Sequence, residues 1–199
     1  MREESESVYE GRRLADTVEG RPGAVWEGKP GGVERRLQDK REGRMDEDVG
    51  SVVSVVSVRD GGEGTVLPGR AGVYYEAEFD AITFDPSMQE VVDGEVVEVV
   101  AFGAFVGIGP VDGLLHVSQI SNEYLAYDGE NQQLASTESN RTLSVGDSVR
   151  VRVVTKSIDE RNPRDSKIGL TAKQPGLGKH GWLEDDRRAN AATTETEGV

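Results

Sequence analysis

Short runs of β-branched and aromatic residues, separated by turn-forming residues, dominate the second half of the chain and constrain its fold more than any other feature. The runs cover residues 94–102, 104–109, 112–118, 147–158 and 166–172. Five short strands without a long helix predict a small Greek-key barrel, and in this size range the OB-fold is the leading candidate. Residues 121–142 are then expected to form a long polar connection with a short helical turn near residues 123–126.

The first half of the chain predicts a smaller, strand-rich domain with one helix. Val33 and Leu37 have helical spacing within residues 32–45, and Gly43 is expected to end that helix. Residues 50–58 are a β-branched run, and residues 73–84 alternate between apolar and charged side chains, which indicates two strands with one solvated face. The expected fold class is therefore α+β, mostly β, with a strand-rich N-terminal domain followed by a five-stranded barrel.

The two ends of the chain are poor in apolar residues and rich in glycine and charge. We therefore expect four segments: a poorly ordered stretch at 1–32, a first domain at 33–90, a barrel at 91–175 and a disordered tail at 176–199. Trp182 is the only large aromatic residue of the tail. Deleting residues 178–199 is accordingly expected to leave the fold intact.

Valines occupy positions 52, 53, 55, 56 and 58, and a regular strand would place them on both of its faces. Only one face can pack inside so small a domain. We therefore expect residues 1–90 alone to aggregate or to remain molten, and to need a second chain for solubility. The alternative is that the barrel covers the second valine face.

Composition excludes several classes of chemistry. The chain has no cysteine and only His116 and His180, so we expect no disulfide, no thiol nucleophile and no thiolate or multi-histidine metal centre. No cofactor and no catalytic residue are expected either. Its start is hydrophilic, and no segment has the roughly 18 unbroken apolar residues of a membrane span. A soluble, cytoplasmic protein without a membrane partner is expected.

The charge is strongly acidic but unevenly distributed. The chain holds 23 Lys and Arg against 37 Asp and Glu, a net charge of −14, which indicates either adaptation to a salt-rich cytoplasm or an ordinary acidic protein. Residues 150–173 nevertheless carry seven basic and three acidic residues, a net charge of +4. This basic segment is where a nucleic acid could bind an otherwise acidic protein.

Besides the basic segment, a group of aromatic residues is a candidate for nucleic-acid binding. Phe102 and Phe105 are three positions apart, and a bulge or turn at Gly103 and Ala104 would place both rings on one face. Strand alternation places His116 beside them, with Leu115 and Val117 pointing inward, so that two phenyl rings and an imidazole form a platform for unstacked bases.

On the fourth strand, Arg150, Arg152 and Lys156 alternate with residues expected to point inward, Thr155 among them, and could accompany a phosphate backbone. In the alternative, the phenylalanines belong to the core and the cations form a solvated face. The residue pattern alone leaves both open.

Two motifs, FGAFV and GLLHVSQI, followed by VGD and KIGLT, make residues 91–173 resemble the S1 RNA-binding domain, a variant of the OB-fold. The resemblance implies that Phe102, Phe105 and His116 are stacking and contact residues. It also implies a polar pair, Asp159 and Lys167, around the last hairpin, although this chain inserts ERNPRDS between the two.

The upstream half extends the resemblance. Residues 35–58 and 62–96, which lead directly into the S1 motifs, are similar to the E-prime stalk subunit of archaeal RNA polymerase, the counterpart of the seventh subunit of eukaryotic RNA polymerase II. Members of that family usually open with an apolar strand, whereas residues 8–32 here hold glycine, proline and charge. Within this resemblance, the acidic, arginine-rich composition fits a haloarchaeal member best.

This resemblance implies a non-catalytic subunit of DNA-directed RNA polymerase that acts in transcription. The 33–90 domain would be the tip domain that docks on the polymerase core and on the smaller stalk subunit, and the S1 domain would bind the nascent single-stranded RNA. Two alternatives are a stand-alone S1-domain RNA-binding protein and a purely architectural subunit that binds no RNA.

Overall fold

The computed structural model describes residues 8–20, 31–46, 48–60, 65–69, 72–157 and 167–196. These residues divide into two compact units, one within residues 1–86 and the other within residues 87–157 and 167–196.

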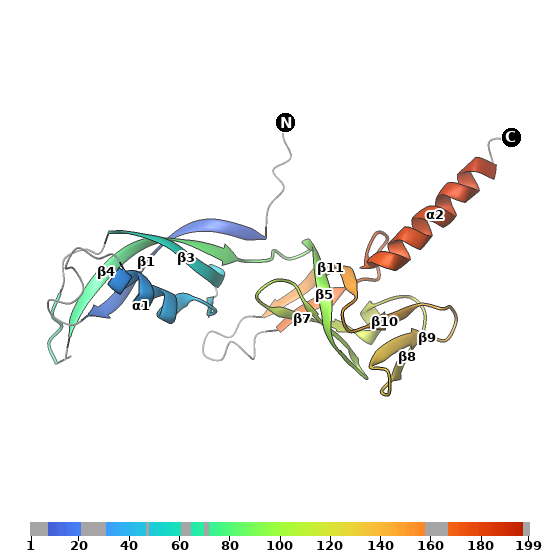
Figure 1. The fold of residues 1–199 in the computed structure, drawn as a ribbon, viewed down its shortest axis with the longest axis horizontal. Coiled ribbons are helices and arrows are strands. Elements are labelled where there is room, and N and C mark those ends of the chain that lie inside the picture. The colour runs from blue at the N-terminus through green and yellow to red at the C-terminus, as the bar shows by residue number, and fades with distance from the viewer. Residues whose placement is uncertain are drawn as a thin grey trace. The chain divides into compact units, whose positions relative to one another are not determined.

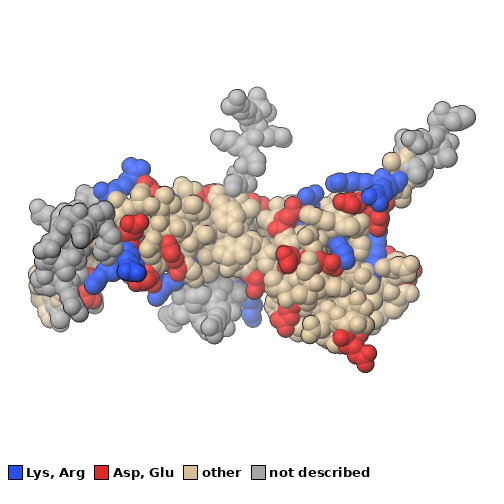
Figure 2. All heavy atoms as spheres, in the orientation of Figure 1, with Lys and Arg blue, Asp and Glu red and all other residues tan. Residues whose placement is uncertain are grey.

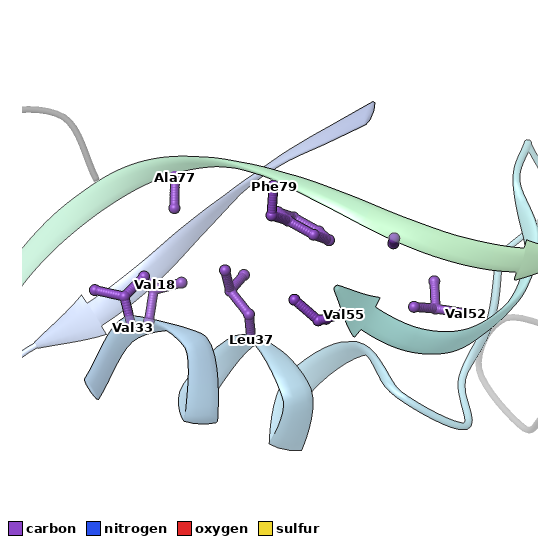
Figure 3. Packing of buried hydrophobic residues seen from close by; sticks show 8 residues of the cluster. Val18, Val33, Leu37, Val52, Val55, Ala77 and Phe79 are labelled. Atoms are coloured by element: carbon purple, nitrogen blue, oxygen red, sulfur yellow. The ribbon is translucent and has the colours of Figure 1, made fainter. Parts of the chain in front are cut away.

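The first unit is a four-stranded antiparallel sheet with one helix (Figure 1). Its elements are β1 (Tyr9–Gly20), α1 (Gly31–Arg41), β2 (Met45–Asp46), β3 (Gly50–Asp60) and β4 (Val73–Phe84), with the strands in the order β1-β4-β3-β2. Val33 and Leu37 of α1 point toward the sheet, where Val18, Val55 and Phe79 meet them (Figure 3). The predicted helix and strand pair are therefore present, and the helix covers one face of the sheet.

The valine run of β3 does not behave as a regular strand. Its register against β4 shifts at three places, and each shift leaves one additional residue on β3. Because the shifts recur every third residue, Val52, Val55 and Val58 all lie opposite β4 residues of the core face. Val56 belongs to the additional residues and is 57% exposed. Buried and exposed valines are therefore both present in β3, as expected, but three bulges rather than regular alternation decide which of them face the core.

The N-terminal segment also departs from prediction. Residues 1–32 were expected to form no stable element, but β1 pairs with β4 along its whole length, from Tyr9 opposite Phe84 to Gly20 opposite Val73. The sequence pattern did not predict this strand because its helix-facing side includes a charged residue, Asp16. The carboxylate of Asp16 binds Lys40 Nζ at 2.8 Å and Arg41 Nε at 2.5 Å. Residues 1–7 and 21–30 lie outside the described residues.

The second unit contains the predicted barrel. Its strands are β5 (Val91–Val100), β6 (Gly103–Gly107), β7 (Asp112–His116), β11 (Ser148–Ser157) and β12 (Lys167–Thr171), followed by the short β13 (Gly178–Lys179). The sheet has the order β12-β7-β6-β5-β11-β13, and an additional pairing of β12 with β11 closes five strands into a barrel. This confirms the predicted fold class. The barrel interior holds Val96, Ala104, Leu115, Val153 and Leu170.

The long connection between β7 and β11 is structured. A 3-10 helix, η1 (Val117–Gln119), is followed by three antiparallel strands: β8 (Leu125–Asp128), β9 (Gln133–Ser136) and β10 (Thr142–Ser144). The expected helical turn near residues 123–126 is absent from this described segment, and Leu125, Leu134 and Leu143 are buried instead. Glu123 accepts hydrogen bonds from Ser136 Oγ at 2.5 Å and Ser139 Oγ at 2.6 Å, which lower its pKa.

The expected disordered tail at 176–199 contains a helix, α2 (His180–Thr196), so that prediction was wrong for its described residues. Trp182, at 8% exposure, anchors the helix, and the Arg141 guanidinium lies 5.6 Å from the centroid of its ring. Arg141 also binds Asp186 at 2.5 Å. The sequence pattern did not predict this helix because it carries one large buried aromatic residue, Trp182, instead of an apolar stripe. None of the helices described is long and apolar enough to cross a membrane.

Candidate nucleic-acid interface

The first feature of the candidate site is an aromatic pair at the start of β6. The rings of Phe102 and Phe105 meet edge to face, with centroids 6.4 Å apart and an angle of 85° between their planes. Gly103, with φ of +156°, separates the rings and lets β6 approach β7 closely, since a Cβ atom there would collide with the carbonyl oxygen of Leu115. Phe102 is 50% exposed and Phe105 is half-buried, whereas Ala104 between them is buried.

His116 lies opposite Gly103 at the end of β7, and its ring is oriented by the residues that follow. The backbone N–H of Ser118 donates to His116 Nδ1 at 3.2 Å, and Ser118 Oγ lies 2.9 Å from the same nitrogen. Because a backbone N–H can only donate, Nδ1 must accept, and the neutral ring carries its proton on Nε2. His116 is exposed, so this Nε2–H is a hydrogen-bond donor available to a ligand oxygen.

The strand register extends the platform across the barrel. Phe105 lies opposite Glu98 of β5 on one side and Leu114 of β7 on the other. Leu114 pairs in turn with Gly169 of β12, which lies opposite Thr155 of β11. The resulting outward-facing row runs across five strands: Glu98, Phe105, Leu114, Gly169 and Thr155. Sequence reasoning did not select Glu98, Gly169 or Thr155, because their positions depend on pairing and on bulges.

A second bulge alters the predicted basic stripe. On β11 the register against β12 shifts between Val153 and Thr155, so that Val154 is the additional residue. Thr155 consequently faces outward, against the prediction, while Lys156 lies opposite the buried Ile168 and does not continue the face of Arg150 and Arg152. The prediction of strict alternation through Lys156 was therefore wrong.

Arg150 is engaged in an ion-pair cluster. Its guanidinium donates to both carboxylate oxygens of Asp93, from Nε at 2.8 Å and from Nη2 at 3.1 Å, and His180 Nε2 lies 3.0 Å from Asp93 Oδ1. The hydrogen bonds from Arg150 hold the pKa of Asp93 below its ordinary value. Since His180 begins α2, this cluster joins the barrel to that helix.

The remaining polar candidates have different surroundings. Arg152 lies opposite Thr171 and is half-buried, and its Nε atom has no hydrogen-bond partner within the part of the chain described. Lys167 begins β12 and is exposed. Asp159 lies outside the described residues, so its predicted pairing with Lys167 stays a prediction.

Among the residues that the structure describes, no group of three or more His, Asp or Glu could hold a metal ion.

Comparisons with known proteins identify the family of the chain. Residues 85–167 match the family model of the S1 RNA binding domain. The DNA-directed RNA polymerase subunit Rpo7 of Saccharolobus shibatae is 38% identical over 154 residues, which cover 76% of this chain and 84% of that relative. The Rpo7 subunit of Sulfolobus acidocaldarius is 36% identical over 151 residues, covering 75% of this chain and 81% of that relative. The chain therefore belongs to the Rpo7 family of archaeal DNA-directed RNA polymerase subunits and carries an S1 domain.

Proposed function

We propose that the chain is a non-catalytic stalk subunit of RNA polymerase whose S1 domain binds the nascent transcript as a single strand. The observation that carries this proposal is the exposed ring of Phe102, in contact with the half-buried Phe105 and close to the oriented ring of His116. A core phenylalanine would be buried, whereas half of the Phe102 side chain is open to solvent. Such a surface offers stacking without demanding a particular base.

The phosphate contacts of this proposal come from three groups around the platform. His116 offers its Nε2–H, Lys167 is exposed, and the charge of Arg152 is compensated by no carboxylate among the ion pairs described. Arg150 contributes less, because Asp93 already neutralises it. Binding then combines stacking, worth about 1–3 kcal/mol per base, with a salt-sensitive phosphate term.

The first unit is proposed to dock on the polymerase core and on the smaller stalk subunit. Two exposed apolar side chains of the sheet support this role, because Val56 of β3 is 57% exposed and Ile82 of β4 is 39% exposed. No described element of the unit covers these two side chains, and exposed apolar surface of this kind favours a protein partner. Co-expression with the smaller stalk subunit should make residues 1–86 soluble and cooperative. Full solubility of this fragment alone would contradict the partner requirement and favour a stand-alone RNA-binding protein.

RNA binding is tested with the full chain and two labelled ligands of equal length, a single-stranded RNA and the corresponding duplex. Fluorescence anisotropy should show tighter binding of the single strand, because only unpaired bases can lie on the rings. Failure to bind the single strand at moderate salt would establish the architectural alternative. Equal affinity for the duplex would indicate phosphate binding without stacking.

We also propose that the chain is adapted to concentrated salt, as in a haloarchaeal cytoplasm. On the face shown in Figure 2, Asp and Glu side chains are spread over both units rather than gathered in one patch. A net charge of −14 repels itself at low ionic strength, and at about 1 M salt the screening length falls to about 3 Å. The unfolding midpoint should therefore rise with KCl up to molar concentration. A flat or falling midpoint would contradict this adaptation.

A further inference from the structure

A bulge in β5 places an acidic side chain beside the platform. Val96 lies opposite Val106 and Glu98 lies opposite Phe105, so Val97 is the additional residue. Val96 and Val99 are both buried, whereas in a regular strand Glu98 would share the inward face of Val96. The bulge therefore turns the carboxylate of Glu98 outward. Bulges that redirect one side chain are common beside functional sites.

Among the described residues, no contact of the Glu98 carboxylate explains this position. Glu98 is exposed, and within the described part of the chain its carboxylate makes no hydrogen bond or ion pair. Side chains directly opposite one another on antiparallel strands have Cβ atoms about 4.5–5.5 Å apart. The carboxylate is thus within reach of the edge of a base that stacks on Phe105.

The charges around Phe105 differ from one side of the ring to the other. Glu98 lies on the β5 side, whereas His116 and Lys167 belong to β7 and β12 on the opposite side. A phosphate backbone is attracted to the second side and repelled from the first. A bound strand would accordingly point its base edges toward Glu98.

On this basis we propose that Glu98 is a specificity-determining residue of the RNA site, favouring bases that carry an exocyclic amino group over uracil. This inference rests on the proposed RNA binding. A carboxylate only accepts hydrogen bonds, and cytosine offers it the N4 amino group. Uracil presents a carbonyl oxygen at the same position, which repels the carboxylate.

The test compares oligo(C) with oligo(U) of equal length, because two pyrimidines stack similarly. Wild-type full chain should bind oligo(C) about fivefold more tightly than oligo(U). In Glu98→Gln the amide offers both a donor and an acceptor, so the preference should fall to near unity. Glu95→Gln is the matched control: it removes the same charge from the outer side of the same strand, but Glu95 lies opposite Gly107 instead of Phe105. This control should keep the preference.

The possible results separate the two proposals. A preference that Glu98→Gln keeps, with both affinities raised equally, would reduce Glu98 to a source of repulsion and overturn the inference alone. Loss of the preference in Glu95→Gln as well would assign it to net charge and likewise overturn the inference. No binding of either oligomer by the wild type would overturn the proposed RNA binding together with this inference.

Discussion

Gly103 lies directly opposite His116 in the ladder between β6 and β7, with no room for a Cβ atom between its backbone and the carbonyl oxygen of Leu115. Gly103→Ala should therefore force β6 and β7 apart, lower the free energy of unfolding by about 1–3 kcal/mol and weaken RNA binding. Chemical denaturation and anisotropy measure the two effects. Gly107→Ala on the same strand is the control, since its nearest contact would be Val97 Cγ1 at 3.3 Å. Equal effects of both substitutions would contradict this role for Gly103.

Phe102 can be tested separately from the core. Because the ring is 50% exposed, Phe102→Ala should weaken RNA binding by about 1–3 kcal/mol with little change in the unfolding midpoint. Tyr124→Ala removes an even more exposed aromatic ring outside the platform and should leave the affinity unchanged. A loss of folding free energy of about 3–5 kcal/mol in Phe102→Ala would instead be the result for a core residue.

Arg150 and Arg152 are predicted to differ in function although they are neighbours on one strand face. Arg152→Ala should lower RNA affinity and reduce by about one the slope of log affinity against log salt. Arg150→Ala should leave that slope almost unchanged and cost about 0.2–1 kcal/mol of stability through loss of the Asp93 pair. Titrations at several salt concentrations distinguish the two variants. Identical slopes in both would contradict the assignment.

Trp182 should make the C-terminal helix contribute to stability. Deleting residues 178–199, or replacing Trp182 by Ala, should lower the melting midpoint by several degrees, because about 1 kcal/mol corresponds to about 4–8 °C in a small domain. A chain that ends after Arg188 keeps Trp182 and its contact with Arg141, and should melt close to the full chain. An unchanged midpoint after the longer deletion would restore the disordered-tail prediction.

Asp16 of β1 forms ion pairs with Lys40 and Arg41 of α1, and their contribution to the free energy of unfolding depends on pH. Burial raises its pKa, but the hydrogen bonds from Arg41 and Lys40 outweigh burial and hold the pKa below the ordinary 3.8. A carboxylate with a lowered pKa stabilises the fold above the unfolded pKa and loses this contribution as pH falls through the folded value. Asp16→Asn should therefore cost about 1–3 kcal/mol at neutral pH, and the difference from wild type should shrink below about pH 3.8. Urea denaturation across pH measures this difference, and a constant difference would contradict it.

Sequence patterns predicted the elements whose periodicity is regular and missed those that depend on pairing. Val33 and Leu37 marked the helix, and the barrel strands followed from their apolar runs. By contrast, β1 was concealed by Asp16, an acidic residue on a core-facing strand that becomes acceptable only beside Lys40 and Arg41. The bulges could not be predicted from the sequence either, because an additional residue on one strand can be recognised only from the pairing with the neighbouring strand.

In the candidate site too, residues of a local motif were predicted and residues whose position depends on strand pairing were not. Phe102, Phe105 and His116 were selectable from a local motif, and the structure brings them to one face. Lys156 was misplaced by one bulge and Glu98 was overlooked because of another. The ion pair between Arg150 and Asp93 could not be predicted from the sequence, because the two residues are 57 positions apart.

Mapping the RNA contact on the full chain tests the central proposal most directly. A short single-stranded RNA is crosslinked by ultraviolet light, and the modified peptides are identified by mass spectrometry. The platform predicts crosslinks within residues 102–116, at Phe102 above all, and their loss in Phe102→Ala with the fold intact. Crosslinks confined to the first unit or to α2 would contradict the platform as the RNA site.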